Sequence, residues 1–248
     1  MNKTLEYFLK MHRLYENKSA QVLIREFHKV LKRIPLKELT LKNAEELILE
    51  AFNVEDFQKV LFQVHRVAGK KFGERIYGKI IEGKKKEYPM FSTAFRTYLL
   101  NYYSTKGGVL ITSIADTFVQ SVMQEIKKST ELGETTTEMQ ERIYRTIKEP
   151  TFYKWQAMRI ARTETSFAMN SAQYVAINTT GVDASKIWIT KKDGRERDSH
   201  TVMNGVKVGM EEHFKVGDSR LLYPSDRENG SSKETIQCRC TYSYVLNR

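Results

Sequence analysis

The sequence has few of the residues that mark several large classes of protein. It has 2 cysteines among 248 residues, both near the C-terminus, which excludes a small disulfide-rich secreted scaffold. Its 4 prolines and 13 glycines exclude collagen-like and low-complexity chains. Hydrophobic residues make up 40% and charged residues 29%, so the composition is that of a folded chain that buries a sizeable core.

Long hydrophobic runs are also missing. The N-terminal segment MNKTLEYFLKMHRLYENK has no apolar stretch with a small-residue cleavage site, so we expect no secretory signal. The most apolar segment, residues 109–123, is interrupted by polar side chains, and a transmembrane helix needs about 20 mostly apolar residues. We therefore expect no membrane span. We also expect the protein to be assembled in a cytoplasm.

The well-marked enzyme motifs are absent as well. The chain contains no phosphate-binding loop, no dinucleotide-binding glycine motif, no nucleophile elbow and no HExxH motif. These absences remove the most easily recognised enzyme classes, and no pattern identifies a catalytic residue.

Positive charge is what the chain has in excess. Lys and Arg total 41 against 30 Asp and Glu, a net charge of +11, which favours nucleic acid, an anionic membrane surface or an acidic partner. The densest basic segment, residues 66–86, contains Arg66, Lys70, Lys71, Arg75, Lys79, Lys84, Lys85 and Lys86. These charges do not share one helical face, so two interpretations stay open: a solvated helix and loop, or a surface that binds phosphate or a partner.

Apolar residues at spacings of three and four predict helices over the first 150 residues. Pro35 ends the first of them. Glycines then interrupt the basic segment, and we expect two separate helices around residues 91–103 and 109–128. The interrupting glycines are Gly69, Gly73, Gly78 and Gly83.

A turn at residues 131–134 separates this bundle from the second half of the chain. A threonine among residues 135–137 is placed to cap a helix over 138–148, and a long helix over 151–179 is expected to stop at Gly181. We divide the chain into a helical region, 1–133, and a C-terminal domain, 134–248.

The pattern changes after Gly181. Residues 186–190 predict a short strand, turn signals lie at 192–194 and 204–205, and the second half of 238–245 alternates like an edge strand. The predicted fold is mainly α with a small α+β C-terminal unit: a multi-helix bundle, a long central helix, then short strands and loops.

Polar residues of this second half are suited to hydrogen bonds and ion pairs that hold its loops in place. Arg162 and Glu164 lie two apart on the long helix and therefore point to different faces. A guanidinium fork matches a carboxylate, so we expect Glu164 to bind Arg197 or Arg239. His200 suits a loop tie through its two ring nitrogens.

Two sharper interpretations of the same residues stay open. The first is a zinc site, because two histidines and two cysteines have the right count for tetrahedral zinc, although their spacing matches no familiar zinc module. A disulfide between Cys238 and Cys240 is disfavoured, because so short a separation strains the bond. Alternatively, His200 acts as a general base oriented by Asp193, Asp198 or Glu234, as in a nuclease. The zinc candidates are His200, His213, Cys238 and Cys240.

Five features occur in a fixed order over the last hundred residues. They are Ala-Arg-Thr-Glu at 161–164, Trp188, an R-x-x-H-x-x-x-N-G segment at 197–205, Pro-Ser-Asp at 224–226, and Cys-Arg-Cys at 238–240. Together they resemble the phage head morphogenesis domain of the Mu F-like minor head proteins, over about residues 153–242. One departure is Gln237, where asparagine is expected. The motif residues are Arg162, Glu164, Trp188, Arg197, His200, Gly205, Pro224, Asp226, Cys238, Arg239 and Cys240.

The resemblance implies a minor capsid component of a tailed bacteriophage or prophage, present in the virion at the head interior or portal vertex. It implies roles in head assembly and in DNA packaging or ejection, without an established enzymatic activity. We expect no cofactor, and zinc stays open as the alternative above. The implied partners are the portal protein, the major capsid or scaffold protein, and packaged double-stranded DNA. The alternatives are a metal-dependent nuclease or hydrolase and a basic nucleic-acid-binding module.

Overall fold

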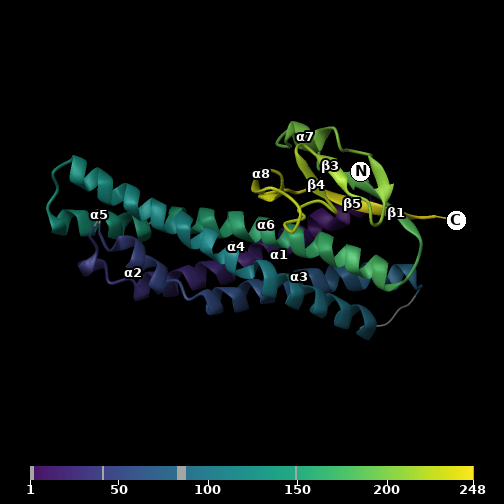
Figure 1. Cartoon of the computed structure of the whole chain (residues 1–248), viewed down its shortest axis with the longest axis horizontal. Coiled ribbons are helices and arrows are strands. Elements are labelled where there is room, and N and C mark those ends of the chain that lie inside the picture. Colours follow the sequence, from purple (N-terminus) through teal and green to yellow (C-terminus); the bar gives the residue numbers. More distant parts are fainter. Residues whose placement is uncertain (1–2, 41, 83–87, 149, 248) are drawn as a thin grey trace.

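The computed structural model describes residues 3–40, 42–82, 88–148 and 150–247. It is a long helical bundle with a small α+β unit packed on one side of it, near one end (Figure 1). The helices are α1 (Lys3–Arg33), the 3₁₀ turn η1 (Leu36–Glu38), α2 (Ala44–Ala51), α3 (Val54–Ile80), α4 (Pro89–Glu131), α5 (Thr136–Lys148), α6 (Pro150–Thr179), α7 (Asp198–Thr201) and α8 (Ser232–Thr235). Within the described ranges no helix is long and apolar enough to cross a membrane.

The C-terminal strands are short and antiparallel. They are β1 (Ala184–Ile189), β2 (Lys207–Gly209), β3 (Phe214–Val216), β4 (Ser219–Leu221) and β5 (Thr241–Leu246). β1 lies between β2 and β5, with Trp188 opposite Tyr242, and β3 and β4 form a separate hairpin. The predicted strand and edge strand correspond to β1 and β5, and the predicted fold class is confirmed.

Helix α6 is the centre of the molecule. Nearly every residue from 160 to 177 is buried, and α1, α3, α4 and β5 pack against it. One continuous apolar core runs from Phe8 in α1 through Phe167 in α6 to Tyr242 in β5. Because this helix is buried on most of its surface, most of its residues are small or apolar.

The contact between α3 and α6 depends on glycine. A Cβ at Gly69 would lie 2.2 Å from Phe95 Cζ and 2.8 Å from the carbonyl oxygen of Ala168. A Cβ at Gly73 would meet Phe91 Cζ at 2.1 Å and the Ala172 carbonyl at 3.0 Å. The prediction that glycines interrupt the basic segment is wrong at Gly69, Gly73 and Gly78, which lie inside α3, and Gly83 lies outside the described residues. Gly69 and Gly73 allow two helices and two phenyl rings to approach.

The two helices predicted around residues 91–103 and 109–128 form a single helix, α4. Helix α4 runs without interruption through the segment between residues 103 and 109, so the prediction of a break there is wrong. A glycine costs about 1 kcal/mol in a helix, far less than a proline, and no proline occurs within the helix after its first residue. Packing of the helix on the core outweighs that cost.

The turn after α4 follows the prediction. Gly133 takes a φ of +67°, and α5 begins with a reciprocal cap between Thr135 and Glu138. The Glu138 backbone N–H donates to Thr135 Oγ1 at 3.3 Å, and the Thr135 backbone N–H donates to Glu138 Oε2 at 2.7 Å. At the end of α6, Gly181 has a φ of +70°, as its position predicted. The domain division at 133 and 134 stays a prediction.

Substituting Gly69 by alanine should destabilise the fold. The added methyl group has to displace both Phe95 and the α6 backbone, so we expect a loss of about 1–3 kcal/mol from overpacking. That loss exceeds the roughly 1 kcal/mol that alanine gains over glycine in helix propensity. Equilibrium unfolding in urea measures the difference.

The matched control is Lys71→Ala on the exposed face of the same helix, which should change stability by less than about 0.5 kcal/mol. Equal or greater stability of the Gly69→Ala variant would contradict the close approach of α3 and α6.

Candidate functional site

A seam of hydrogen bonds joins α6 to the Cys-Arg-Cys segment and β5. Ser166 Oγ donates to the Cys238 carbonyl at 2.6 Å, Asn170 Nδ2 to the Cys240 carbonyl at 3.1 Å, and Gln173 Nε2 to the Tyr242 carbonyl at 2.8 Å. Residues three and four apart share one face of a helix, and every second residue of an extended chain points the same way. The two periods therefore match, and we name these contacts the α6 seam.

Arg162 and Glu164 point to different places, as their spacing predicted. Arg162 donates to Glu16 Oε1 of α1 at 2.8 Å and to Gln237 Oε1 at 3.0 Å. Glu164 instead binds Arg227 Nη1 at 2.7 Å and His65 Nε2 at 2.9 Å.

The predicted partners of Glu164 are wrong. Arg197 donates to the carbonyl oxygen of Ile236 at 2.6 Å, and Arg239 binds Asp193 through two nitrogens, at 2.6 and 3.0 Å. Arg197 precedes α7, and Arg239 lies in the segment that the α6 seam holds, but its side chain goes to Asp193 instead of Glu164. Arg227, which no sequence pattern singled out, fills the position instead.

The Glu164 carboxylate is 1% exposed and depends on its partners. Burial alone would raise its pKa, but the Arg227 guanidinium and the His65 ring offset that effect and hold the pKa below its ordinary value. His65 also receives a hydrogen bond from the Tyr103 hydroxyl, at 3.1 Å from Nδ1. This cluster connects α3, α4, α6 and the loop after β4.

Asp226 organises that loop. Its carboxylate accepts from the backbone N–H of Leu222 at 2.8 Å and of Glu228 at 3.0 Å, and it is fully buried. The carbonyl oxygen of Pro224 accepts from Asn170 Nδ2 at 2.9 Å. The Pro-Ser-Asp motif therefore attaches this loop to the α6 seam.

Trp188 and Gly205 shape the loop between β1 and β2. Trp188 is fully buried, with its ring centroid 5.2 Å from that of Phe214 and 5.6 Å from that of His200. Gly205 has a φ of +87°, and its N–H donates to the Trp188 carbonyl at 2.9 Å. A side chain with a Cβ would strain this turn, which explains glycine there.

Three of the four predicted zinc ligands meet. His200 Nδ1 lies 3.7 Å from Cys238 Sγ and 3.5 Å from Cys240 Sγ, and all three residues are buried. His200 Nε2 lies 3.0 Å from Glu234 Oε2, so Glu234, rather than Asp193 or Asp198, orients the ring. His213 is exposed and stands outside the cluster. We name His200, Cys238 and Cys240 the His–Cys cluster.

The basic segment of α3 does not form one surface. Lys84, Lys85 and Lys86 lie outside the described residues. Arg66, Lys71, Arg75 and Lys79 are exposed and Lys70 is half-buried, and they spread around α3 rather than along one face. Arg75 stacks on the ring of Tyr7 at 3.9 Å, and Lys70 pairs with Glu74 at 3.7 Å.

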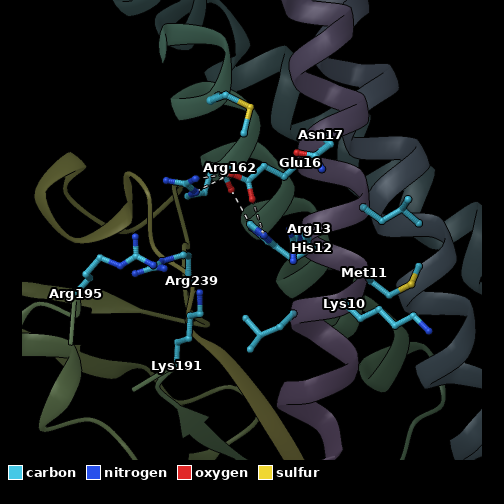
Figure 2. A pocket seen from close by; sticks show the side chains of 13 residues that line it. Lys10, Met11, His12, Arg13, Glu16, Asn17, Arg162, Lys191, Arg195 and Arg239 are labelled. Atoms are coloured by element: carbon cyan, nitrogen blue, oxygen red, sulfur yellow. Dashed lines mark hydrogen bonds and ion pairs between the residues drawn. The ribbon is translucent and has the colours of Figure 1, made fainter. Parts of the chain in front are cut away.

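A second basic surface is a cleft of about 960 Å³ between α1, α6 and the loop after β1. Figure 2 shows Lys191, Arg195 and Arg239 on the side of the C-terminal unit, facing Arg162, Glu16 and His12. Sequence reasoning missed this basic cleft, although the run of charges at 191–197 was a signal for it. The cations that line it are Lys10, Arg13, Arg162, Lys191, Arg195 and Arg239.

Two carboxylates balance part of the charge of the basic cleft. Glu16 pairs with Arg162, and Asp193 pairs with Arg239, with Lys191 at 3.0 Å and with Arg195 at 3.1 Å. Burial acts to raise the pKa of Asp193, but Lys191 and Arg239 hold it well below its ordinary value. Six cations against two carboxylates leave the cleft positive.

Replacing Glu164 by glutamine tests the buried cluster. Removal of one partner from a buried ion pair costs about 3–5 kcal/mol, so we expect a large fall in thermal stability at pH 7. Because the folded-state pKa of Glu164 is depressed, its contribution is complete above the ordinary carboxyl pKa and disappears as the pH falls. The variant should therefore lose less stability than the natural protein on acidification from neutral pH.

The control is Glu50→Gln, an exposed carboxylate on α2, which should leave melting and its pH dependence nearly unchanged. Parallel pH profiles of the Glu164→Gln variant and the natural protein would count against the charged cluster.

Comparison with known proteins gives a relationship over this same region. The model of the phage Mu protein F like family matches residues 118–243, from the end of α4 to β5. A curated relative, the NAD(+)–arginine ADP-ribosyltransferase EFV of Enterococcus faecalis, is 33% identical over 110 residues. That match covers 42% of this chain, and the chain spans only 22% of the relative. No solved structure matches. Since the family model covers more than half of its residues, the chain belongs to the phage Mu protein F like family, which connects it with bacteriophage head morphogenesis.

Proposed function

We propose that this chain is a minor head protein of a tailed bacteriophage or prophage, acting without catalysis in head assembly at or near the portal. The observation that carries the proposal is the family match over α5, α6 and the C-terminal unit. Most motif residues of that region, including Glu164, Trp188 and Asp226, are buried and hold the fold together, whereas Arg162 and Arg239 line the basic cleft.

The nuclease alternative is less well supported by the geometry. His200 and Glu234 are each 2% exposed, so the ring does not face solvent, where a phosphodiester could reach it. The ADP-ribosyltransferase activity in the relative's name belongs to a protein of which this chain spans 22%, and our proposal carries none of it over.

The location we propose is the virion, at the head interior or portal vertex. Helices α1, α2, α3 and most of α4 precede the family-matched region, and α1, α3 and α4 pack against α6 (Figure 1). We assign them the docking role, with the portal protein, the major capsid protein or the scaffold as partner.

The basic cleft supports one further part of the proposed role, which is contact with packaged double-stranded DNA during packaging or ejection. Phosphates are attracted by an excess of Lys and Arg, and each neutralised phosphate releases a counterion. The cleft presents arginines from α1, α6 and the C-terminal unit on one surface, whereas the cations of α3 diverge.

The assembly role predicts incorporation into particles. In a host that carries the phage or prophage, we expect mass spectrometry to find the protein in purified heads, and the full chain to co-sediment with the portal ring. Deletion of the gene should lower the yield of infectious particles, and supplying it in trans should restore it. Heads that lack the protein, with an undiminished yield of particles, would refute the proposal.

DNA contact predicts salt-dependent binding that the double variant Arg13→Glu, Arg195→Glu weakens. Both side chains line the basic cleft and are exposed, so the fold should tolerate the change. The plot of log affinity against log salt has a negative slope, and each lost phosphate contact makes it shallower by about 0.9. Two lost contacts therefore make it shallower by about 2. Fluorescence anisotropy with duplex DNA measures both effects.

The matched control is Lys18→Glu, Lys127→Glu, which changes the net charge equally at exposed positions outside the cleft. If Lys71→Glu, Arg75→Glu abolishes binding while the cleft variant does not, the basic segment of α3 is the DNA surface instead.

A further inference from the structure

The His–Cys cluster has no task in the assembly role, and its geometry is unusual for a structural tie. It gathers one imidazole nitrogen and two sulfurs, all within 4.8 Å of one another, in the interior of the C-terminal unit. We propose that His200, Cys238 and Cys240 form a zinc site.

The interatomic distances fit a tetrahedral zinc ion. Zinc binds histidine nitrogen at about 2.05 Å and thiolate sulfur at about 2.3 Å, and a tetrahedral angle then sets nitrogen and sulfur about 3.6 Å apart. The observed distances from His200 Nδ1 are 3.7 Å to Cys238 and 3.5 Å to Cys240. A simple hydrogen-bonded tie needs only one sulfur near the ring nitrogen, whereas a shared metal needs both.

The fold presents the two sulfurs and the ring from separate elements. Cys238 and Cys240 lie two apart on the extended segment that leads into β5, so both side chains point to the same side. In the α6 seam, Ser166 Oγ donates to the Cys238 carbonyl at 2.6 Å and Asn170 Nδ2 donates to the Cys240 carbonyl at 3.1 Å, which fixes this backbone. His200 comes from α7, and Thr190 Oγ1 holds its carbonyl at 2.7 Å.

A carboxylate behind the histidine completes the arrangement. Glu234 Oε2 lies 3.0 Å from His200 Nε2 and also receives the Ser199 hydroxyl at 2.8 Å. A metal-bound histidine usually donates its other N–H to such a carboxylate, which fixes the tautomer and directs the free nitrogen at the metal. With Nε2 protonated, Nδ1 points its lone pair at the two sulfurs.

Trp188 supplies an independent observation. Its indole N–H is fully buried in the apolar cluster with Cys238 and Cys240, and the Cys240 sulfur is the acceptor beside it among the described residues. A buried donor without a partner costs about 1–3 kcal/mol. A thiol sulfur is a weak acceptor, and a metal-bound thiolate at Cys240 would be a stronger one for this donor.

Charge and size also favour a metal. Zn²⁺ with two thiolates and a neutral imidazole has no net charge, so a buried complex escapes the cost of an unpaired charge. The apolar cluster around the site has only seven buried residues, and small units of this kind are commonly held by a structural metal. Three protein ligands leave one position of the tetrahedron to a ligand from outside this cluster.

The test is metal analysis of the untagged full-length chain, purified without chelator and then incubated with zinc and desalted. We expect about one zinc per chain by mass spectrometry of the metal, and a reversible fall in melting temperature when a chelator removes it. Cobalt should replace zinc and produce the intense visible absorption bands of tetrahedral cobalt with thiolate ligands.

Variants identify the ligands. Cys240→Ser and His200→Asn should lose the bound metal, and circular dichroism checks that each variant folds. Glu234→Gln should keep the stoichiometry but weaken zinc binding about 10–100-fold, since it acts through His200. The matched control is His213→Ala, a histidine of the same unit outside the cluster, which should bind zinc as the natural protein does.

Two outcomes would overturn the site. The first is less than about a tenth of a zinc per natural chain after incubation with excess metal, which would make the cluster a hydrogen-bonded tie. The second is full stoichiometry in a folded Cys240→Ser variant, which would place the metal elsewhere. Neither outcome bears on particle incorporation, so this inference and the proposed head role are tested separately.

Discussion

Hydrogen bonds from α6 side chains to the main chain of residues 237–242 hold the C-terminal unit on the bundle, and the arrangement of the other motif residues follows from them. Strands of three to six residues in sheets of two and three strands bury little surface by themselves. The α6 seam gives this backbone fixed partners inside the core. Each such bond contributes about 0.5–1.5 kcal/mol net, but leaving its buried carbonyl unpaired costs more.

The seam requires a buried polar helix, and that requirement extends to the rest of the chain. Ser166, Asn170 and Gln173 reach their partners only because α1 and α3 cover other parts of α6 and exclude water. The glycines of α3 allow this cover to approach closely. Glu164 then connects the cover to the loop after β4 through His65 and Arg227. The helices before the family-matched region are therefore part of its support as well as our candidate docking surface.

Local patterns predicted the elements well where the signal lies within a few residues. The three-and-four spacing of apolar residues predicted the helices. One of the threonines at 135–137 caps α5, and Gly181 follows the end of α6, as expected. The same patterns failed where packing outweighs propensity. Gly69 and Gly73 lie inside α3, and α4 continues through the expected break. A glycine has the same local preference in both settings, and only its neighbours in space decide between them.

The sequence by itself determined that helices come first and short strands follow, the ordered family motif and the candidate residues for charge and metal chemistry. Periodicity and capping act within about four residues along the chain, so they are visible without a structure. Tertiary structure decided which of those residues meet. It paired Glu164 with His65, 99 residues away, and Arg162 with Glu16, 146 residues away. It also brought His200 to Cys238 and Cys240 while leaving His213 outside, and it assembled the basic cleft from three elements. Such pairings depend on how helices pack around a shared core, a constraint that acts across the whole chain and leaves no mark in any local stretch of residues.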